Sequence, residues 1–411
     1  MSSPRLRLRL TAAAESIIRH GHPWVYSDSI REQNRDGTTG ELAVIYDRND
    51  RFLAIGLYDA VSPLRVRILH AGKPVNLDAT WWALHLRKSL ERRNGLGTDE
   101  TTGYRLIHGE SDGWPGLVLD RYGEVLVLKL YTGAWLPRLD EIAALIVAEC
   151  RPTRLILRLS RNLQEDAARI GRTDGSLLAG EAGPGVALFR ENGLTFEADV
   201  LKGQKTGFFL DQRDNRHIVE GISSGAEVLN AFSFSGGFSL YAARGGARQV
   251  TDLDISRHAL DSGARNFALN QTFATVRACQ REALQVDVFA WLRHTDTRQF
   301  DVVILDPPSL AKREADRPDA IDAYARLAFE GMRRVRPGGW LLAASCSAHV
   351  QADEFFATVR SALSQTPTRW TEVQTTEHPL DHPADFPEGR YLKAIYLRTA
   401  HDRGTGRSGI G

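Results

Sequence analysis

A repeated alternation of strands and helices in the second half of the chain limits the fold more than any other feature. From about residue 191, apolar segments of strand length alternate with amphipathic segments of helix length. This pattern predicts a mostly parallel sheet with helices on both faces, so we expect a doubly wound, Rossmann-like α/β domain. The expected strands are AEVLNAF, RQVTDLD, TVRACQ, FDVVILD, GGWLLAASCS, TRWTEVQTTE and YLKAIYLR, and the first helices are GFSLYAARGG and SRHALDSGARNFALN.

Two of these assignments rest on short patterns. TVRACQ is expected as the third strand, which would place Cys279 on a strand. After FDVVILD, five apolar residues recur at helical spacing and predict a helix that contains them. They are Ile321, Tyr324, Leu327, Ala328 and Val335.

The chain is too long for one core, and we expect several domains. We divide its 411 residues into 1–72, 73–190 and 191–400, followed by a flexible tail at 401–411. The first part has the alternating segments of a small β-rich module, and the second mixes helices and strands without a catalytic cluster. In the second part, LLAGEAGPG is expected as a connector or a hairpin.

Arginines alternate with apolar residues in the first module. RLRLRL and RVRI each place Arg on one face of a strand. Two interpretations are open: a half-exposed strand whose solvated face is charged, or a surface that contacts phosphates. Because the formal net charge is only +1, any affinity for RNA must come from such local patches.

Several classes of protein are excluded by composition and spacing. No apolar stretch is long enough to cross a bilayer, and the N-terminal MSSPRLRLRL lacks the apolar core of a signal peptide. We therefore expect a cytoplasmic protein. The three cysteines, Cys150, Cys279 and Cys346, are far apart and form no CxxC pair, which argues against disulfides and a structural zinc site.

Residues at the ends of the expected strands predict a nucleoside cofactor. Glycine lets a backbone approach a ligand closely, and ligands of doubly wound sheets bind at the carboxyl ends of the strands. Asp254 ends the second strand, where such folds hold ribose hydroxyls, although Asp252 points to the same face. Asp287 follows the third strand, where an adenine amino group could be bound. The candidates from the first strand and its turn are Asn230, Phe232, Ser235, Gly236 and Gly237.

The fourth expected strand ends in LDPPS, and this segment favours S-adenosylmethionine (SAM) over NAD as the nucleoside cofactor. NAD would also use the acid of the second strand, but a carboxylate followed by two rigid prolines is not expected there. The Asp-Pro-Pro at this place resembles motif IV of SAM-dependent methyltransferases that act on nucleic-acid bases. We therefore add Asp306 and Pro307 to the SAM-binding candidates; the alternative is a Pro-Pro turn that only ends the strand.

Cys346 is the candidate nucleophile. It ends the fifth strand, next to the strand of Asp306, so the two should face one crevice. C5 of a pyrimidine is a weak nucleophile until a thiolate adds to C6, and Asp306, protonated or bonded to N3, would offset the charge of that adduct. The base that removes the C5 proton is not identified. Cys150 and Cys279 have no comparable setting.

Longer segments carry a resemblance to a family. HPWVYSDSI, KTGFFLDQRDNR, NAFSFSGGF, DPPS, SCS and HPADFPEGRYLK stand in the order found in bacterial 23S rRNA large-subunit methyltransferases of the cytosine-C5 type, and the match covers almost the whole chain. This resemblance implies that SAM is the cofactor, that Phe209, Asp211 and Arg213 line its pocket, and that an N-terminal PUA domain positions the rRNA. It also makes the loop from His382 to Arg390 a candidate target-facing edge.

Alternatives stay open at this point. Large-subunit guanine-N7 methyltransferases share the fold and the Asp-Pro-Pro, so the cytosine-C5 assignment depends mainly on Cys346. Methylation of uracil C5 or of a nitrogen would use the same cofactor. A non-catalytic RNA-binding assembly factor is a candidate from another class. A homodimer is one option for the oligomeric state.

Overall fold

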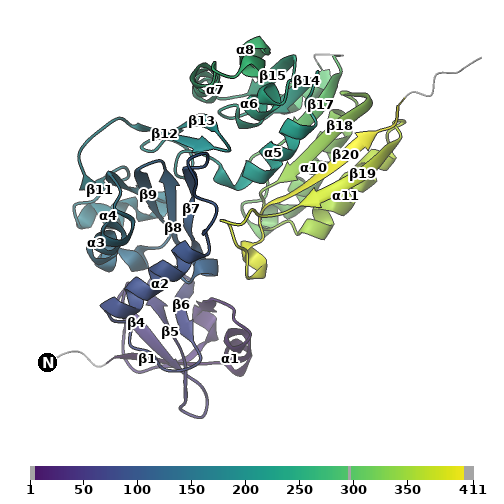
Figure 1. Cartoon of the computed structure of the whole chain (residues 1–411). Helices are drawn as coiled ribbons and strands as arrows, with labels where there is room; N and C mark the ends of the chain where they lie inside the picture. Colours follow the sequence, from purple (N-terminus) through teal and green to yellow (C-terminus); the bar gives the residue numbers. More distant parts are fainter. Residues whose placement is uncertain (1–4, 295–297, 402–411) are drawn as a thin grey trace, which may run out of the picture. The chain divides into compact units, whose positions relative to one another are not determined.

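The computed structural model describes residues 5–294 and 298–401. The chain divides into two compact units: Met1–Leu210 with Leu380–Gly389, and Asp211–Pro379 with Arg390–Gly411. Each unit has its own sheets and its own apolar core (Figure 1). Of the expected tail at 401–411, all but His401 lies outside the described residues.

A six-stranded sheet opens the first unit, in the order β2-β6-β5-β4-β1-β3. Its elements are β1 (Leu6–Leu10), α1 (Ala12–Arg19), β2 (Trp24–Tyr26), η1 (Ser27–Ser29), β3 (Ile30–Gln33), β4 (Leu42–Tyr46), β5 (Phe52–Tyr58) and β6 (Leu64–Ala71). The alternation of β1 buries its three leucines and points Arg7 and Arg9 outward. The Thr11 side chain caps α1 by accepting from the Ala14 N–H. The expected β-rich module is confirmed.

Some of the arginines that alternate with apolar residues in this sheet form ion pairs with acidic side chains. Arg9 forms ion pairs with Glu32 at 3.4 Å and with Asp50. Arg67 of β6 is paired with Glu110 at 2.9 Å, and both side chains are largely buried. The charges of Arg9 and Arg67 are therefore neutralised by carboxylates of the same chain. The interpretation of these strands as a phosphate-contacting surface does not rest on these two arginines.

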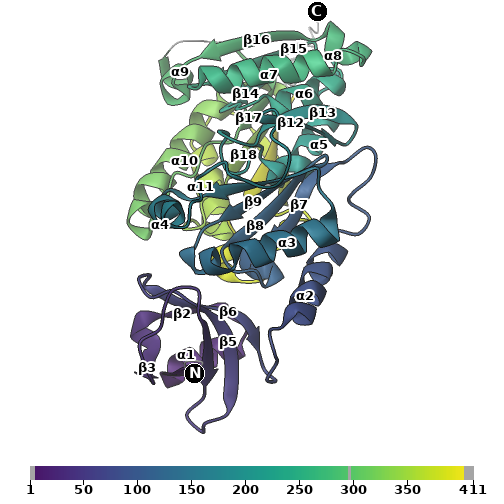
Figure 2. The same ribbon diagram turned by 90° about the vertical axis from the view of Figure 1, so that its left-hand side faces the viewer.

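A five-stranded sheet, β11-β10-β9-β8-β7, follows in the first unit. Its elements are α2 (Ala79–Glu91), β7 (Gly103–His108), η2 (Gly109–Asp112), β8 (Leu117–Tyr122), β9 (Val125–Leu130), η3 (Gly133–Arg138), α3 (Leu139–Cys150), β10 (Arg154–Leu159), η4 (Arg161–Leu163), α4 (Gln164–Arg169) and β11 (Leu177–Gly180). Helix α3 packs along this sheet (Figure 2), and Trp82, Trp114 and Trp135 are buried in their common core. The connector expected at LLAGEAGPG is right only for its last five residues, which link β11 to β12, because the first four residues pair with β10 as an edge strand.

A two-stranded hairpin, β12 (Val186–Glu191) and β13 (Leu194–Asp199), follows. The expected boundary between residues 190 and 191 falls inside this hairpin, whereas the two compact units meet at Leu210. The division into residues 1–72, 73–190 and 191–400 as independently folding domains stays a prediction.

The segment of residues 380–389 is tied to the first unit through Asp381 and His382, which are buried. Arg93 is paired with Asp112 at 2.6 Å and donates to the Asp381 carbonyl at 2.9 Å. The Arg105 N–H donates to the Asp381 carboxylate at 2.9 Å, and His382 is 1% exposed. The start of the loop expected at a target-facing edge is therefore buried, because these charged groups satisfy one another inside the protein.

The second unit contains a seven-stranded sheet in the order β16-β15-β14-β17-β18-β20-β19. Its elements are η5 (Leu210–Gln212), α5 (Arg213–Gly221), β14 (Glu227–Ala231), α6 (Gly237–Arg244), β15 (Gln249–Asp254), α7 (Arg257–Leu269), α8 (Ala274–Ala278), β16 (Gln280–Gln285), α9 (Val288–His294), β17 (Phe300–Leu305), η6 (Glu314–Asp316), α10 (Arg317–Met332), β18 (Val335–Ser345), α11 (Ala352–Ser364), β19 (Trp370–Thr376) and β20 (Lys393–Thr399). The short turn η7 (Pro387–Gly389) belongs to the first unit.

Five strands of this sheet, β14 to β18, are parallel, and β20 pairs antiparallel with β18 and with β19. Helices α9, α10 and α11 share one apolar core with β14, β17 and β18. Helix α6 packs against α5 and α7 and against β14 and β15, and α7 packs against β15 and β16. The expected doubly wound, Rossmann-like fold is confirmed, and the reversal of strand order at β14 and β17 marks the crevice where such sheets bind ligands.

Two expected elements are wrong. TVRACQ is not the third strand: Ala274–Ala278 forms α8, Cys279 caps it, and the strand is Gln280–Gln285. This edge strand is polar and partly exposed, so it has little apolar signal of its own. Val335 does not belong to the helix after FDVVILD, because α10 ends at Met332 and Val335 pairs with Phe300 as the first residue of β18.

Across residues 5–294 and 298–401, every helix is too short or too polar to span a lipid bilayer.

Candidate active site

The turn after β14 has an unusual backbone. Phe232, Phe234 and Gly236 have φ values of 63°, 47° and 74°, in the left-handed region that bulky side chains rarely adopt. The turn is closed by a hydrogen bond from the Gly236 N–H to the Ser233 carbonyl at 2.9 Å and tied to β15 by one from the Ser233 N–H to the Leu253 carbonyl at 2.9 Å. Such strain concentrates at ligand-binding sites.

Several polar side-chain atoms in this turn and at the end of β14 could form hydrogen bonds to a ligand. Among the described residues, Asn230 Oδ1, Ser233 Oγ and Ser235 Oγ are buried and have no hydrogen-bond partner. A buried polar group without a partner costs free energy, so these three atoms, just before the N-terminus of α6, fit a polar ligand such as a nucleoside cofactor. The residues present therefore suit the cofactor that the sequence predicts. Gly236 caps α6 and Gly237 is its first residue.

Asp254 and Asp252 have different surroundings. The Asp254 carboxylate accepts from the N–H groups of Phe234 at 2.9 Å and Ser256 at 2.8 Å, and it is partly exposed beside the turn. Asp252 is fully buried and paired with Arg281 at 2.7 Å. Between the two acids that the sequence left open, Asp254 is the one at the rim of the site.

Asp287 lies at the start of α9, which contacts Phe232 of this turn. The Asp287 side chain is exposed and caps α9 by accepting from the Ala290 N–H at 2.8 Å. The ring of Phe289, on the same helix, lies edge-on to the Phe232 ring with their centroids 5.6 Å apart. This contact brings the start of α9 next to the strained turn. A role for Asp287 in binding adenine stays a prediction.

Asp306 is held by an amide that the sequence analysis did not select. Gln212 Nε2 donates to Asp306 Oδ1 at 2.9 Å, and Asn215 Nδ2 donates to Gln212 Oε1 at 2.6 Å. Asn215 Oδ1 accepts from the hydroxyls of Thr376 at 2.6 Å and Tyr396 at 2.9 Å. Two signals in the sequence could have found them: both lie in KTGFFLDQRDNR, and Gln212 and Asn215 are three residues apart on one helical face.

The other residues implied by the resemblance lie in the same segment. Asp211 is 4% exposed and accepts from the Tyr391 hydroxyl at 2.9 Å, and Arg213 is 2% exposed at the start of α5. Phe209 belongs to the first unit, where the Lys205 ammonium lies 4.6 Å from the centroid of its ring. The SAM-pocket role of these three residues stays a prediction.

Cys346 lies directly after β18 and next to the Asp-Pro-Pro turn. Its Sγ is 3.8 Å from the Pro307 carbonyl oxygen, and the side chain is only partly buried. Because β17 and β18 are paired neighbours, with Leu305 opposite Ala343, the structure brings the thiol to the turn that carries Asp306. Burial raises the pKa of both Cys150 and Cys279 to about 11, so neither thiol has a comparable setting.

The serines on both sides of Cys346 anchor it. Ser345 and Ser347 are fully buried. Ser347 Oγ accepts from the N–H groups of Leu310 at 3.0 Å and Ala311 at 3.2 Å, just beyond the Asp-Pro-Pro turn. The Tyr324 hydroxyl of α10 is 2.8 Å from Ser347 Oγ and accepts from Ser345 Oγ at 2.9 Å. This network joins the carboxylate turn to the thiol turn.

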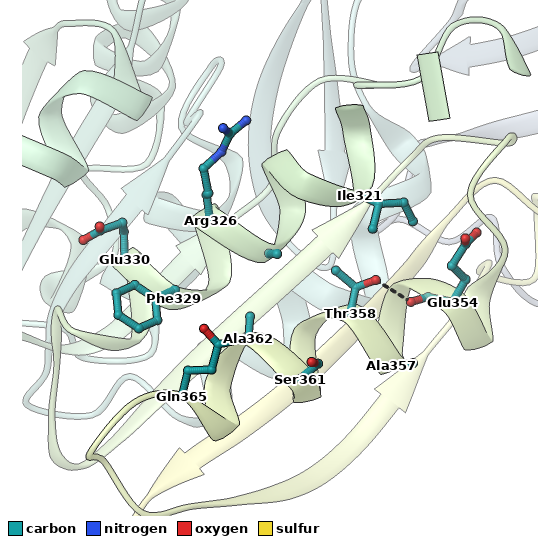
Figure 3. Close-up of a pocket in the computed structure, with 11 residues that line it drawn as sticks. Ile321, Arg326, Phe329, Glu330, Glu354, Ala357, Thr358, Ser361, Ala362 and Gln365 are labelled. Carbon is teal, nitrogen blue, oxygen red and sulfur yellow. Dashed lines mark hydrogen bonds between the residues drawn. The ribbon is translucent and has the colours of Figure 1, made fainter. Parts of the chain in front are cut away.

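A separate groove of about 650 Å³ lies between α10 and α11 (Figure 3). Apolar groups such as Ile321, Phe329 and Ala362 line it together with Arg326 and Glu330. None of the residues that line it belongs to the predicted site. The groove is therefore not part of the crevice at the strand ends.

Family models match both parts of the chain. The model described as S-adenosylmethionine-dependent methyltransferase matches residues 104–398, and a PUA-like domain model matches residues 8–71. The methyltransferase model thus includes the five-stranded sheet as well as the doubly wound domain. Two solved structures have the same fold: a SAM-dependent methyltransferase candidate from Streptococcus mutans (TM-score 0.79, 22% identity, 95% of this chain and 99% of that one) and a methyltransferase candidate in complex with SAH (TM-score 0.81, 23% identity, the same coverage).

Two relatives match over nearly their full length. The ribosomal RNA large subunit methyltransferase of Deinococcus radiodurans is 56% identical over 404 residues, which are 97% of this chain and 98% of that protein. The ribosomal RNA large subunit methyltransferase I of Aliivibrio fischeri is 34% identical over 394 residues, 95% of this chain and 98% of that protein. The chain therefore belongs to the SAM-dependent methyltransferases, in the family of the ribosomal RNA large subunit methyltransferases with a PUA-like N-terminal domain, and SAM is its cofactor.

Proposed function

We propose that this protein methylates C5 of a cytosine in 23S rRNA through a transient covalent bond between Cys346 and C6 of the base. The observation that carries the proposal is the position of the Cys346 thiol, 3.8 Å from the carbonyl of Pro307, which follows Asp306 in the same turn. A methyltransferase that acts on an oxygen or an exocyclic nitrogen needs no thiol beside this turn, whereas activation of C5 does.

The side chains would divide the reaction as follows. The Cys346 thiolate adds to C6, and the electrons of the C5–C6 bond move into the ring while Asp306, acting as an acid or hydrogen-bond donor at N3, offsets the charge. C5 is then nucleophilic. Bound SAM supplies an electrophilic methyl group beside it. A base that we do not assign removes the C5 proton, the C5–C6 double bond re-forms, and the sulfur leaves as a thiolate. A proton that Asp306 has donated to N3 returns to Asp306 in this step.

Binding of the cofactor would use the turn and the strand ends around it. Asn230, Ser235 and the N-terminus of α6 at Gly236 and Gly237 face the polar part of the ligand, because their buried polar atoms need partners. Asp254 would bind the ribose hydroxyls. The remaining proposed contacts are Phe209, Asp211, Arg213, Phe232, Asp287, Asp306 and Pro307.

The partner that we propose is rRNA of the large subunit, as the names of the relatives indicate. The PUA-like module would position the RNA through its sheet surface, and the activity would take place in the cytoplasm, where this RNA is. PUA-like modules add contacts away from the reacting base, so they raise affinity without taking part in the chemistry.

The test is a pair of cysteine variants. We expect Cys346→Ala to lower methyl transfer to 23S rRNA by at least about 1,000-fold, because the unactivated C5 does not react, while SAM binding by calorimetry stays within twofold. Cys279→Ala, which removes a thiol away from the site, should keep full activity. Nucleoside mass spectrometry of the product should show 5-methylcytidine.

Each alternative gives another result. A product of 5-methyluridine would assign the same thiol to uracil C5, and full activity of Cys346→Ala with an N-methylated product would exclude the adduct. A protein that binds RNA but transfers no methyl group in either form would be the non-catalytic assembly factor.

A further inference from the structure

Lys393, the first residue of β20, is a fully buried lysine to which the proposed reaction gives no role. It stands opposite Ser345 in the antiparallel pair of β18 and β20. Its ammonium donates to three carbonyl oxygens, those of Ser347, Val350 and Tyr391. Lysines are almost never fully buried without partners, so this arrangement calls for an explanation.

The three carbonyl acceptors indicate the protonation state of the Lys393 side chain. An ammonium has three N–H donors, and here each has a backbone carbonyl. A neutral amine would turn its lone pair toward a carbonyl oxygen, so the geometry favours the charged form. With all three donors directed at the main chain, Lys393 is not placed to accept the C5 proton, and we exclude it as the missing base.

Two of the acceptors belong to the turn that follows the nucleophile. Ser347 is the neighbour of Cys346, and Val350 ends the same turn. The third, Tyr391, donates its hydroxyl to Asp211 at 2.9 Å. The ammonium thus joins the thiol turn to the segment of Asp211.

Few anionic groups surround the ammonium. Burial lowers the pKa of Lys393 to about 8, and the negative charges of Cys346, Glu354 and Glu377 oppose that effect. Glu354 of α11 is already paired with Arg317 at 2.8 Å, and Glu377 is exposed to solvent beyond β19. The titratable group that faces the turn from α10 is the neutral Tyr324. The Cys346 thiolate is therefore the anion that a charge at Lys393 affects most.

We propose that Lys393 is the positioning residue of Cys346: its buried ammonium holds the turn from Ser347 to Val350 by hydrogen bonds and stabilises the adjacent thiolate by its charge. This role rests on the proposed function, in which Cys346 is the nucleophile. It predicts a thiol that is ionised near neutral pH, as nucleophilic addition to C6 requires.

The first experiment uses the native protein. Iodoacetamide reacts with the thiolate, so the pH dependence of alkylation, followed by mass spectrometry of the peptide that contains each cysteine, reports each thiol pKa. We expect a midpoint for Cys346 below about 8.5, the ordinary value for cysteine, and midpoints well above it for Cys150 and Cys279, the internal references. A midpoint for Cys346 at or above the ordinary value overturns the inference.

The second experiment compares Lys393→Met with Lys393→Arg. The Met variant keeps the apolar stem without the charge, and alkylation of Cys346 at pH 7 should fall about tenfold, which corresponds to one pKa unit. The kcat of methyl transfer should fall with it, while KM for RNA stays within twofold. The Arg variant keeps the charge and should restore part of the alkylation rate.

Thermal unfolding and SAM binding show whether each variant is folded. A folded Lys393→Met protein with an unchanged alkylation profile overturns the inference, and if that variant does not fold, the profile of the native protein decides alone. Alkylation does not depend on the methylated product. Failure of the cytosine-C5 proposal would therefore appear in the product nucleoside and leave this measurement intact.

Discussion

The Gln212 side chain is bonded at both ends of its amide. Nε2 donates to the Asp306 carboxylate, and Oε1 accepts from Asn215, whose own oxygen is bonded by Thr376 and Tyr396. Such a chain leaves the amide one orientation, because rotation by 180° would place an oxygen against the carboxylate. The amide N–H of Gln212 thereby orients Asp306, which suits the role of acid or hydrogen-bond donor at N3 that we propose for it.

Removal of that amide should affect the reaction more than the cofactor. We expect Gln212→Ala to lower kcat by about 10- to 100-fold, the effect of losing one hydrogen bond to a charged group. SAM affinity should change less than threefold in calorimetry. Gln271→Ala, which removes an amide that donates to the Phe267 carbonyl of α7, is the matched control and should retain kcat. Equal losses of SAM affinity and kcat would show that Gln212 serves the cofactor instead.

Among the elements, the turn between β14 and α6 concentrates the backbone constraints of the site. Gly236 has φ of 74°, and a Cβ placed there would meet only ordinary contacts, the nearest being Gly263 Cα at 3.5 Å. The need for glycine at this position is therefore conformational and not a matter of space. Gly225, before β14, has φ of 69° and no atom near its missing Cβ.

These two glycines form a matched pair for a test. Alanine at either position should cost about 1–2 kcal/mol of folding free energy, because L-residues are disfavoured in the left-handed region, and thermal unfolding measures this loss. Only Gly236→Ala should also weaken SAM binding, by about tenfold, since its turn presents the buried polar atoms of Asn230 and Ser235. Equal SAM affinity in the two variants would remove the turn from the cofactor site.

On the scale of the whole molecule, a net charge of +1 gives no general attraction to RNA. Local groups of basic residues must supply the attraction to RNA. The two outward-facing arginines of β1 differ in whether an acidic side chain neutralises their charge. Arg9 is paired with Glu32 and Asp50. Arg7 lies beside the Tyr46 ring, 5.7 Å from its centroid, with no carboxylate in ion-pair range within the part of the chain that the structure describes. Its charge is therefore the more available for a phosphate.

A comparison of these neighbours tests the RNA surface. Arg7→Ala should lower the affinity for 23S rRNA several-fold and reduce the salt dependence of binding by about one counterion, while kcat at saturating RNA is unchanged. Arg9→Ala should have the smaller effect, because that charge is already neutralised. Binding titrations at several salt concentrations measure both, and an Arg7→Ala profile identical to the native one would place the RNA elsewhere.

The sequence by itself determined the doubly wound domain, because alternating apolar periods of two and 3.6 residues are local properties that burial must satisfy. It also predicted that the candidate site residues Asp254, Asp306 and Cys346 lie at strand ends, where the structure has them. It failed where local patterns were weak, as at the polar edge strand β16. Only the tertiary structure decided how the proposed reacting groups are held: Gln212 reaches Asp306 across 94 positions, and Lys393 reaches Ser347 across 46. A hydrogen bond between residues far apart in the sequence leaves no periodic pattern along the chain. It can be recognised only after folding of the sheet has brought the donor and the acceptor together.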